Sequence, residues 1–295
     1  MNLSLSRSFP IAKAALAAAV IACTFALACS LTGCASGGTD SSSADADNTS
    51  ASTDGKTLRV AMELAYPPFE TKDDAGNPEG LAVDFIRDFG AAYGYDVQIE
   101  NTAWDGLIPS LQSDKADLVI SSMTITDERK QSVDFSDAYA MAQLAILANA
   151  DSGVASIDDL NQPGKKVTVK TGSTGDVYVT KNLTNAEIVR LADESACVTE
   201  VVQGKADGFL YDQLTIYRNH QANPDTTEAV FIPFQDAEEW GIAVKKGNTE
   251  LLDQLNAFIA QSKTDGEFDR LTEKYLADEK KAFDQYGFKW FFDFE

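Results

Sequence analysis

The chain has 295 residues, a length that suits one large or two medium domains, and 44% of them are hydrophobic, which is enough for a sizeable core. Its 46 acidic residues outnumber its 24 basic ones and give a formal net charge of −22. A surface with this charge repels phosphate backbones and anionic lipid headgroups, so the composition argues against nucleic acid as a partner.

The start of the chain resembles the signal peptide of a bacterial lipoprotein. Two basic residues come first, and Ala14–Ala28 is then an apolar run that is short for a membrane span and right for a signal sequence. Residues 31–34 (LTGC) match the lipobox, in which the cysteine thiol takes a diacylglyceryl group; the alternative is an ordinary signal peptide with an incidental cysteine. We expect residues 1–33 to be removed and Cys34 to anchor the mature protein outside the cytoplasm, on the outer face of the cell membrane or in the periplasm.

The segment after that cysteine is a predicted linker. Residues 35–55 contain no aromatic residue, Leu, Ile or Val, so they cannot bury enough apolar surface to fold. We therefore expect residues 34–55 to be a flexible tether. Three of the four cysteines lie at or before residue 34, which leaves Cys197 as a predicted core thiol without a disulfide partner.

The folded part begins with alternating strands and helices. Thr57–Met62 is apolar enough for a strand, and the two prolines within residues 63–69 force an extended turn after it. Residues 83–93 place apolar side chains at helical spacing and stop at Gly94, a residue type that favours the left-handed end of a helix. A strand is predicted over Asp96–Glu100.

The stretch over residues 104–139 carries the strongest functional pattern. It predicts a short helix over residues 105–113 and a buried parallel strand over residues 117–122. Ligands of open α/β sheets bind just outside the carboxyl ends of the strands. Hydroxyl groups gather at this strand end and Arg129 follows, whose guanidinium offers two parallel N–H donors to a carboxylate. A site for a small carboxylate is predicted; the alternative is a surface loop in which Arg129 pairs with a neighbouring acid.

A second set of elements repeats this order. The tripeptide Lys-Ala-Asp precedes a strand at residues 115–117 and again at 205–207, and both strands end in polar residues. Two similar α/β lobes that face each other across a cleft are the simplest explanation. The predicted strands of this part are 143–149, 167–170, 187–191 and 208–212, with helices from residue 176 and over 193–203.

The last part of the chain is predicted to return to the first lobe. Trp240–Lys245 is a strand, and Asn248 caps a helix with apolar residues on one face. A final helix is predicted over Thr264–Ala277. The aromatic tail, residues 286–294, is expected to pack on the core because exposed aromatic side chains are unfavourable.

Residues 104–139 also resemble a known family, the solute-binding proteins (family 3) of polar amino acid ABC importers. Their signature, WDGLIPAL…KADVIISGMTIT-ER…VDFSDPY, matches this chain over a long and nearly ungapped stretch. The resemblance implies an α/β, two-lobed periplasmic-binding-protein-like fold of type II with a two-strand hinge. Residues 56–144 and 239–295 would form lobe 1, and residues 145–238 lobe 2. It also implies a free L-amino acid as ligand, an ABC transporter permease as partner, a monomer and no cofactor.

The resemblance assigns the charged ends of the amino acid to residues of both lobes. Arg129 is expected to bind the α-carboxylate, and Asp212 the α-ammonium, although Asp212 is alternatively a solvated residue at a helix start. Four hydroxyl residues are expected to add bonds to the ligand. Two of them lie at a predicted helix start, where free N–H groups favour a carboxylate and where plain capping is the alternative. The four are Ser122, Thr124, Ser173 and Thr174.

The remaining expected site residues surround the rest of the ligand. Tyr66 and Trp104 match aromatic positions that enclose the ligand in related proteins, whereas Phe69 is expected in the core. Glu63 and Lys170 match positions that contact the ligand's side chain. One acid and one base suit a neutral amide, so a glutamine-like ligand is predicted; the alternatives are a basic amino acid and a simple ion pair between Glu63 and Lys170.

The sequence argues for a binding protein rather than an enzyme. It contains no GxSxG, P-loop, HExxH or GxGxxG motif, and no spaced Cys/His cluster that predicts a metal site. Dehydratases and peptidoglycan lyases are known on the resembled fold and form the alternative. A third is the sensing domain of a receptor, which would normally continue into a transmembrane helix and a signalling domain.

Overall fold

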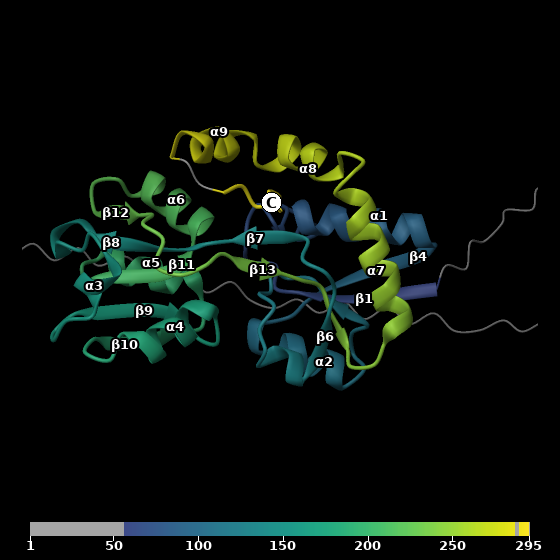
Figure 1. Ribbon diagram of the computed structural model, residues 1–295, viewed down its shortest axis with the longest axis horizontal. Coiled ribbons are helices and arrows are strands. Elements are labelled where there is room, and N and C mark those ends of the chain that lie inside the picture. Colours follow the sequence, from purple (N-terminus) through teal and green to yellow (C-terminus); the bar gives the residue numbers. More distant parts are fainter. Residues whose placement is uncertain (1–55, 287–288, 295) are drawn as a thin grey trace, which may run out of the picture. The chain divides into compact units, whose positions relative to one another are not determined.

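The computed structural model describes residues 56–286 and 289–294. The predictions of a signal segment, of a lipidated Cys34 and of a linker concern residues outside these ranges. The described chain forms two α/β lobes that are joined by a pair of strands (Figure 1).

Lobe 1 is built on a five-stranded sheet with the strand order β4-β1-β5-β14-β6. β1 runs parallel to both of its neighbours, whereas β14 runs antiparallel to β5 and β6. Because β14 comes from a much later part of the chain, this lobe is discontinuous in sequence. The strands are β1 (Lys56–Met62), β4 (Tyr95–Asn101), β5 (Leu118–Val119), β6 (Val133–Phe135) and β14 (Ala243–Lys245), and β2 (Thr71–Lys72) and β3 (Pro78–Glu79) form a separate hairpin.

The helices of lobe 1 confirm two predicted end signals. The first helix ends at Gly94, which has a φ of 74° and donates its N–H to the carbonyl of Gly90. The side chain of Asn248 caps another helix by accepting the N–H of Leu251. The helices and 3-10 turns are α1 (Leu81–Tyr93), η1 (Trp104–Gly106), α2 (Leu107–Gln112), η2 (Arg129–Gln131), α7 (Thr249–Ser262) and α8 (Glu267–Tyr275).

The strand predicted over residues 117–122 is shorter than expected, since β5 covers only Leu118 and Val119. Ser122 has a φ of 47°, in the left-handed region where a strand cannot continue. The chain therefore changes direction at this strand end, and the hydroxyl residues that follow line the space between the lobes.

Lobe 2 has a five-stranded sheet in the order β10-β9-β11-β8-β12. β9 is parallel to β10 and β11, whereas β8 is antiparallel to β11 and β12. The predicted strands of this lobe are confirmed, and a helix that the sequence did not predict, α6, starts directly after Asp212. The elements are β8 (Leu144–Asn149), η3 (Ala150–Ser152), α3 (Ile157–Leu160), β9 (Lys166–Lys170), α4 (Thr174–Asn182), β10 (Glu187–Leu191), α5 (Glu194–Val202), β11 (Gly208–Asp212), α6 (Gln213–Ala222) and β12 (Thr227–Val230). Cys197 is fully buried, as predicted, and burial raises the pKa of its thiol to about 12.

Two strands join the lobes. β7 (Ala140–Ala142) and β13 (Glu238–Trp240) pair antiparallel as a small sheet of their own. The prediction of one strand over residues 240–245 is wrong, because β13 ends at Trp240 and β14 begins at Ala243. At the break, Gly241 donates its N–H to the carbonyl of Met123, and a Cβ added there would lie 2.8 Å from the Ile125 side chain.

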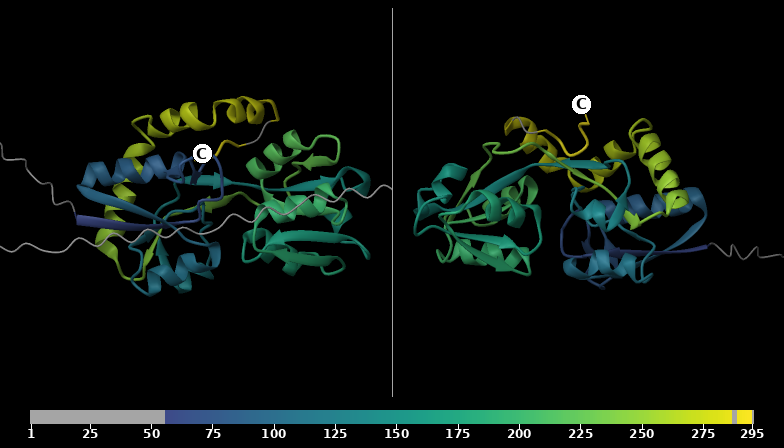
Figure 2. Two further views of the ribbon diagram at one scale, coloured as in Figure 1. Left: turned by 180° about the vertical axis from the view of Figure 1, so that it is seen from behind. Right: turned by 60° about the horizontal axis from the view of Figure 1, so that its bottom comes forward.

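The C-terminal part departs most from the prediction. The helix predicted over residues 264–277 is present as the shorter α8, but it is not the last one, because α9 (Ala277–Tyr286) follows it. Leu276 separates the two helices: its φ is −138° and its side chain is buried in the core of lobe 1. Both views of Figure 2 show α8 and α9, in yellow, on one side of the lobes. α9 also reaches α6 of lobe 2, since Glu279 lies 3.3 Å from the guanidinium of Arg218.

The described part of the aromatic tail, residues 289–294, packs on the core, as predicted. Trp290 and Phe291 are buried, and the ring of Phe291 lies 5.2 Å from that of Phe69 and 5.6 Å from that of Trp240. Met141 in β7 donates its N–H to the carbonyl of Phe291 at 2.7 Å. The tail therefore supports both strands that join the lobes. Within the part of the chain described here, no helix is long and apolar enough to cross a membrane.

Candidate functional site

A cavity lies between the two lobes. Nine of the ten site residues predicted from the sequence line it, and Lys170 is the exception. The lining residues are Glu63, Tyr66, Glu70, Trp104, Ser121, Ser122, Thr124, Arg129, Ala142, Leu144, Ser173, Thr174, Glu194, Tyr211, Asp212, Glu238 and Trp240.

Arg129 begins the turn η2 and points its guanidinium across the cavity from lobe 1. Nη1 donates to the carbonyl of Thr124 at 2.7 Å, and Nη2 donates to the carbonyl of Gly172 in lobe 2 at 3.2 Å. The guanidinium also lies 5.2 Å from the centre of the Trp104 ring. Burial lowers the pKa of Arg129, and its guanidinium donates to backbone carbonyls rather than to the neighbouring acids of a surface loop. A buried guanidinium has lost the water that would solvate it, and the carboxylate of a ligand can take the place of that water.

The hydroxyl residues after β5 are bonded to carboxylates of the cleft. Ser122 donates from Oγ to Glu70 Oε2 at 3.1 Å, and Thr124 donates from Oγ1 to Glu238 Oε2 at 3.0 Å. The left-handed backbone of Ser122 is uncommon for a residue other than glycine and is found more often at functional sites than elsewhere.

The hydroxyl residues of lobe 2 lie at the start of α4. Ser173 caps this helix by accepting the N–H of Asp176 at 3.2 Å. The capping that the sequence left as an alternative role is therefore observed. Thr174 instead donates its hydroxyl to Glu238 Oε2 at 2.7 Å. Thr124 of lobe 1 and Thr174 of lobe 2 thus hold the same carboxylate oxygen.

Asp212 is a buried carboxylate at the end of β11. Its Oδ1 accepts the hydroxyl of Tyr66 at 2.7 Å across the cleft. It also caps α6 by accepting the N–H groups of Leu214 at 2.9 Å and Thr215 at 3.2 Å. Burial raises the pKa of Asp212, and these hydrogen bonds oppose that shift. The carboxylate is fixed in place where an ammonium group could reach it.

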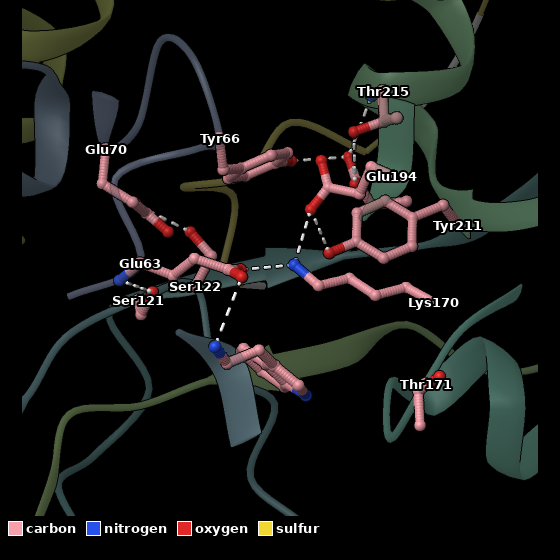
Figure 3. A network of polar contacts seen from close by, with 12 residues as sticks. Glu63, Tyr66, Glu70, Ser121, Ser122, Lys170, Thr171, Glu194, Tyr211 and Thr215 are labelled. Carbon is pink, nitrogen blue, oxygen red and sulfur yellow. Dashed lines mark hydrogen bonds and ion pairs between the residues drawn. The ribbon is translucent and has the colours of Figure 1, made fainter. Parts of the chain in front are cut away.

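Lys170 lies beside the cavity and is held by two carboxylates. Its Nζ donates to Glu63 of lobe 1 and to Glu194 Oε1 of lobe 2, the latter at 3.0 Å. The side chain is only 2% exposed. Burial alone lowers the pKa of Lys170, but the charges of Glu194 and Glu63 outweigh it and the pKa is raised. The ion pair that the sequence analysis left as an alternative is therefore formed, and Figure 3 shows these side chains pointing toward one another.

Three of the carboxylates that line the cavity were not predicted: Glu70, Glu194 and Glu238. Glu194 begins α5 and accepts the hydroxyl of Tyr211 at 2.9 Å, and burial raises its pKa. Glu70 is 1% exposed, and its carboxylate accepts the hydroxyl of Ser122. Burial raises the pKa of Glu70 well above its usual range, and the nearby charges of Glu194 and Glu63 raise it further.

Other lining residues were also missed, and the sequence held few signals for them. Tyr211 precedes Asp212 on a predicted strand, and the strand pattern marks only its last residue as facing the cleft. Glu70 follows the Pro-Pro-Phe turn, which the sequence marks as a turn without indicating which residues face the cleft. Glu238 lies in a segment without apolar periodicity, so its direction depends on the pairing of β13 with β7.

Comparisons with known proteins agree on the class of protein. The family model of bacterial extracellular solute-binding proteins, family 3, matches residues 58–278. A probable histidine-binding protein of Neisseria gonorrhoeae is 36% identical over 260 residues, which cover 86% of this chain and 94% of that protein.

Solved structures are similar over most of the described chain. Two structures of an ancestral arginine-binding protein, one bound to arginine and one to glutamine, each align with a TM-score of 0.69 at 37% identity and cover 75% of this chain and 98% of theirs. An ancestral amino acid-binding protein, described as a precursor of cyclohexadienyl dehydratase, aligns with a TM-score of 0.68 at 37% identity and covers 74% of this chain and 94% of its own.

The chain belongs to the bacterial extracellular solute-binding proteins, family 3, and has the two-lobed periplasmic-binding-protein fold of type II. The relatives compared above are named as binding proteins rather than as enzymes.

Proposed function

We propose that this protein binds a free basic amino acid, with arginine the leading candidate, between its two lobes and delivers it to an ABC importer. One observation carries the proposal: Glu63 and Glu194 share the single ammonium group of Lys170, and Glu70, whose pKa responds to the charges of all three, lines the same cavity. The amino acid's carboxylate would bind Arg129, its α-ammonium would bind Asp212, and its cationic side chain would extend toward these three carboxylates.

The balance of charge favours a cationic side chain. Even without Glu238, four carboxylates line the cavity, against the guanidinium of Arg129 and the ammonium of Lys170 beside it. A zwitterion with a neutral side chain leaves this excess of negative charge unchanged, whereas arginine or lysine reduces it. Buried charges without compensation are unfavourable, so the cleft gains most from a ligand that carries a net positive charge.

This proposal differs from the glutamine-like ligand that the sequence predicts. That prediction depends on a free Lys170 that donates to an amide, but its ammonium is shared between Glu63 and Glu194. A lysine whose charge is already neutralised repels a cationic ligand only weakly. The similarity to a probable histidine-binding protein and to an ancestral arginine-binding protein supports the same choice, although the latter was also solved with glutamine.

The test is a set of dissociation constants for arginine, lysine, histidine, glutamine and glutamate, measured by calorimetry at one salt concentration. We expect arginine or lysine to bind most tightly and glutamate most weakly. Tighter binding of glutamine than of any basic amino acid would reject the proposed side-chain class while leaving the amino acid site intact.

Lys170→Met sharpens this test. The variant removes the competing ammonium, so the ratio of arginine affinity to glutamine affinity should rise. Lys165→Met is a matched control, because Lys165 also belongs to lobe 2 and also pairs with a carboxylate, that of Asp207 at 2.9 Å, but neither of its partners, Ser152 and Asp207, lines the cavity. A ratio that rises because glutamine binds more weakly, with arginine binding unchanged, would show instead that Lys170 donates to the amide of the ligand.

We also propose that a lipid on Cys34 holds the protein, as a monomer, at the outer face of a membrane near its permease. The lipobox at residues 31–34 supports this, and lipid chains bind membranes through their buried CH₂ groups. Cys34→Ser should move the protein from the membrane fraction to the soluble fraction. If the variant still sediments with membranes in high salt, another segment anchors it.

A further inference from the structure

Glu238 places a carboxylate in the cleft for which the proposed function has no role. It is the first residue of β13, one of the two strands that join the lobes, and its side chain is half-buried. Its Oε2 accepts hydrogen bonds from Thr124 Oγ1 at 3.0 Å and Thr174 Oγ1 at 2.7 Å, and its Oε1 accepts one from Gln235 Nε2 at 2.7 Å.

The two hydroxyl donors come from opposite lobes, and both are expected to bond the ligand, Thr174 at its carboxylate. Thr124 follows β5 of lobe 1, and Thr174 begins α4 of lobe 2. Arg129 is nearby, and Glu238 contributes the largest of the charge effects that raise its pKa against the effect of burial. Glu238 therefore presents to these donors the same chemical group, a carboxylate, that an amino acid would bring.

We propose that Glu238 is an internal competitor for the α-carboxylate of the ligand and that it must leave Thr124 and Thr174 when an amino acid binds. Each hydroxyl has one proton to donate, so two carboxylates cannot both be served by the same pair of donors. Two carboxylates at hydrogen-bond distance from shared donors would also repel each other in a cleft of reduced dielectric. Glu238 thereby lowers the affinity for amino acids and sets how readily the bound one is released. This inference depends on the proposed function only in that the ligand has a carboxylate.

Glu238 competes with the carboxylate of the ligand and not with its side chain. Agmatine is arginine without the carboxylate, so it can bind while Glu238 keeps both hydroxyl partners. Comparing the two compounds separates the proposed competition from a general effect of Glu238 on the cleft.

The experiment measures the binding of arginine and agmatine to the wild-type protein and to Glu238→Ala by calorimetry. We expect arginine to bind Glu238→Ala about tenfold more tightly, the scale of exchanging a charge-assisted hydrogen bond for water, and agmatine to change by less than about twofold. Glu238→Gln keeps an acceptor but loses the charge, so its arginine affinity should fall between the other two. Glu239→Ala is the matched control, because Glu239 lies next in the same strand with an exposed side chain.

Three results would overturn the inference: weaker arginine binding to Glu238→Ala, unchanged arginine binding, or an equal gain for arginine and agmatine. The first would mean that Glu238 holds the ligand rather than competing with it. Thermal unfolding of each variant checks that it is folded. Arginine binding to the wild-type protein tests the proposed function separately, and if another amino acid binds best, that amino acid and its decarboxylated amine replace the pair.

Discussion

The two lobes have similar sheets but different interiors. The buried core of lobe 1 is rich in aromatic rings that come from both ends of the described chain: Phe69, Phe85, Phe89, Tyr139, Trp240, Phe268, Phe283, Trp290 and Phe291. The corresponding core of lobe 2 contains aliphatic side chains from one continuous stretch, among them Ile146, Val167, Val169, Val179 and Leu210.

This difference extends to the groups that face the cleft. In lobe 1, the ring of Tyr66 stacks on that of Phe69 at 5.5 Å, and Phe69 in turn contacts Phe291 of the C-terminal tail. In lobe 2, Asp212 is held by hydrogen bonds to residues of the helix that it caps, Leu214 and Thr215. The cleft face of lobe 1 therefore depends on packing between distant parts of the sequence, whereas that of lobe 2 depends on local capping and ion pairs.

The largest expected effect on ligand affinity comes from removing the positive charge that lobe 1 contributes to the cleft. Arg129→Ala should weaken amino acid binding at least thousandfold, or about 4 kcal/mol, because a buried carboxylate would lose its charged partner. Calorimetry measures the affinity, and thermal unfolding should stay close to that of the wild-type protein. Lys130→Ala, at an exposed neighbouring position, is the control, and near-normal affinity in folded Arg129→Ala would show that the carboxylate binds elsewhere.

Phe291→Ala tests whether the aromatic core supports the cleft. Its ring is fully buried among Phe69, Trp240 and Trp290, so we expect a loss of about 3–4 kcal/mol in the free energy of unfolding. Since Phe69 carries the ring of Tyr66, ligand affinity should fall as well. Chemical denaturation and calorimetry measure the two effects. A destabilised variant with unchanged affinity would separate the tail from the cleft.

Asp212→Asn probes the cleft group that lobe 2 supplies. Asparagine still caps a helix and still accepts a hydrogen bond from Tyr66, so the fold should be retained. The ligand's ammonium loses its counter-charge, and affinity should fall about hundredfold, or 2–3 kcal/mol. Asp207→Asn is the control, because that acid pairs with Lys165 away from the cavity. Equal losses in both variants would point to a general change of charge in lobe 2.

Val169→Ala is the lobe 2 counterpart of the Phe291 variant. Val169 is fully buried in β9, and removing two methyl groups should lower the free energy of unfolding by about 2 kcal/mol. Because the cleft groups of lobe 2 are held by local bonds, ligand affinity should change little. A loss of affinity as large as that of Phe291→Ala would remove the proposed difference between the lobes.

Glu70→Gln should give the smallest effect, and it should be stabilising. Burial raises the pKa of this carboxyl in the folded protein, so ionisation at neutral pH opposes folding. The wild-type protein should gain stability from this group as the pH falls through the raised pKa. The gain should end when the pH reaches 4.5, the ordinary pKa of a glutamate side chain. The variant should be about 1 kcal/mol more stable at neutral pH.

The pH dependence of the free energy of unfolding distinguishes the raised pKa of Glu70 from a general effect of removing a carboxylate. The difference between the wild-type protein and Glu70→Gln should shrink as the pH falls from neutral toward 4.5, as measured by chemical denaturation at several pH values. Glu79→Gln, which changes an exposed carboxyl in the same lobe, should show no such trend. A difference that stays constant with pH would mean that folding does not raise the pKa of Glu70.

Much of the fold follows from local patterns in the sequence. The strands β10 and β11 match their predicted bounds, and Gly94 and Asn248 end and begin helices as predicted. These signals are local because the left-handed conformation and the cap each involve residues within one turn. The strand end with Arg129 also marked the cleft, because the position of a ligand at the carboxyl ends of strands is a property of the sheet topology.

Only the tertiary structure decided which charges meet. The sequence contains Glu63, Lys170 and Glu194 far apart, and nothing local indicates that one ammonium is shared between two carboxylates from different lobes. Glu70 faces the cleft because of a turn in which it pairs with Tyr66, and Glu238 because the pairing of β13 with β7 brings distant segments together. Electrostatic energies depend on distance and burial, which the fold sets. The sequence thus determined the class of protein, and the arrangement of its lobes determined the charge that the cleft presents to a ligand.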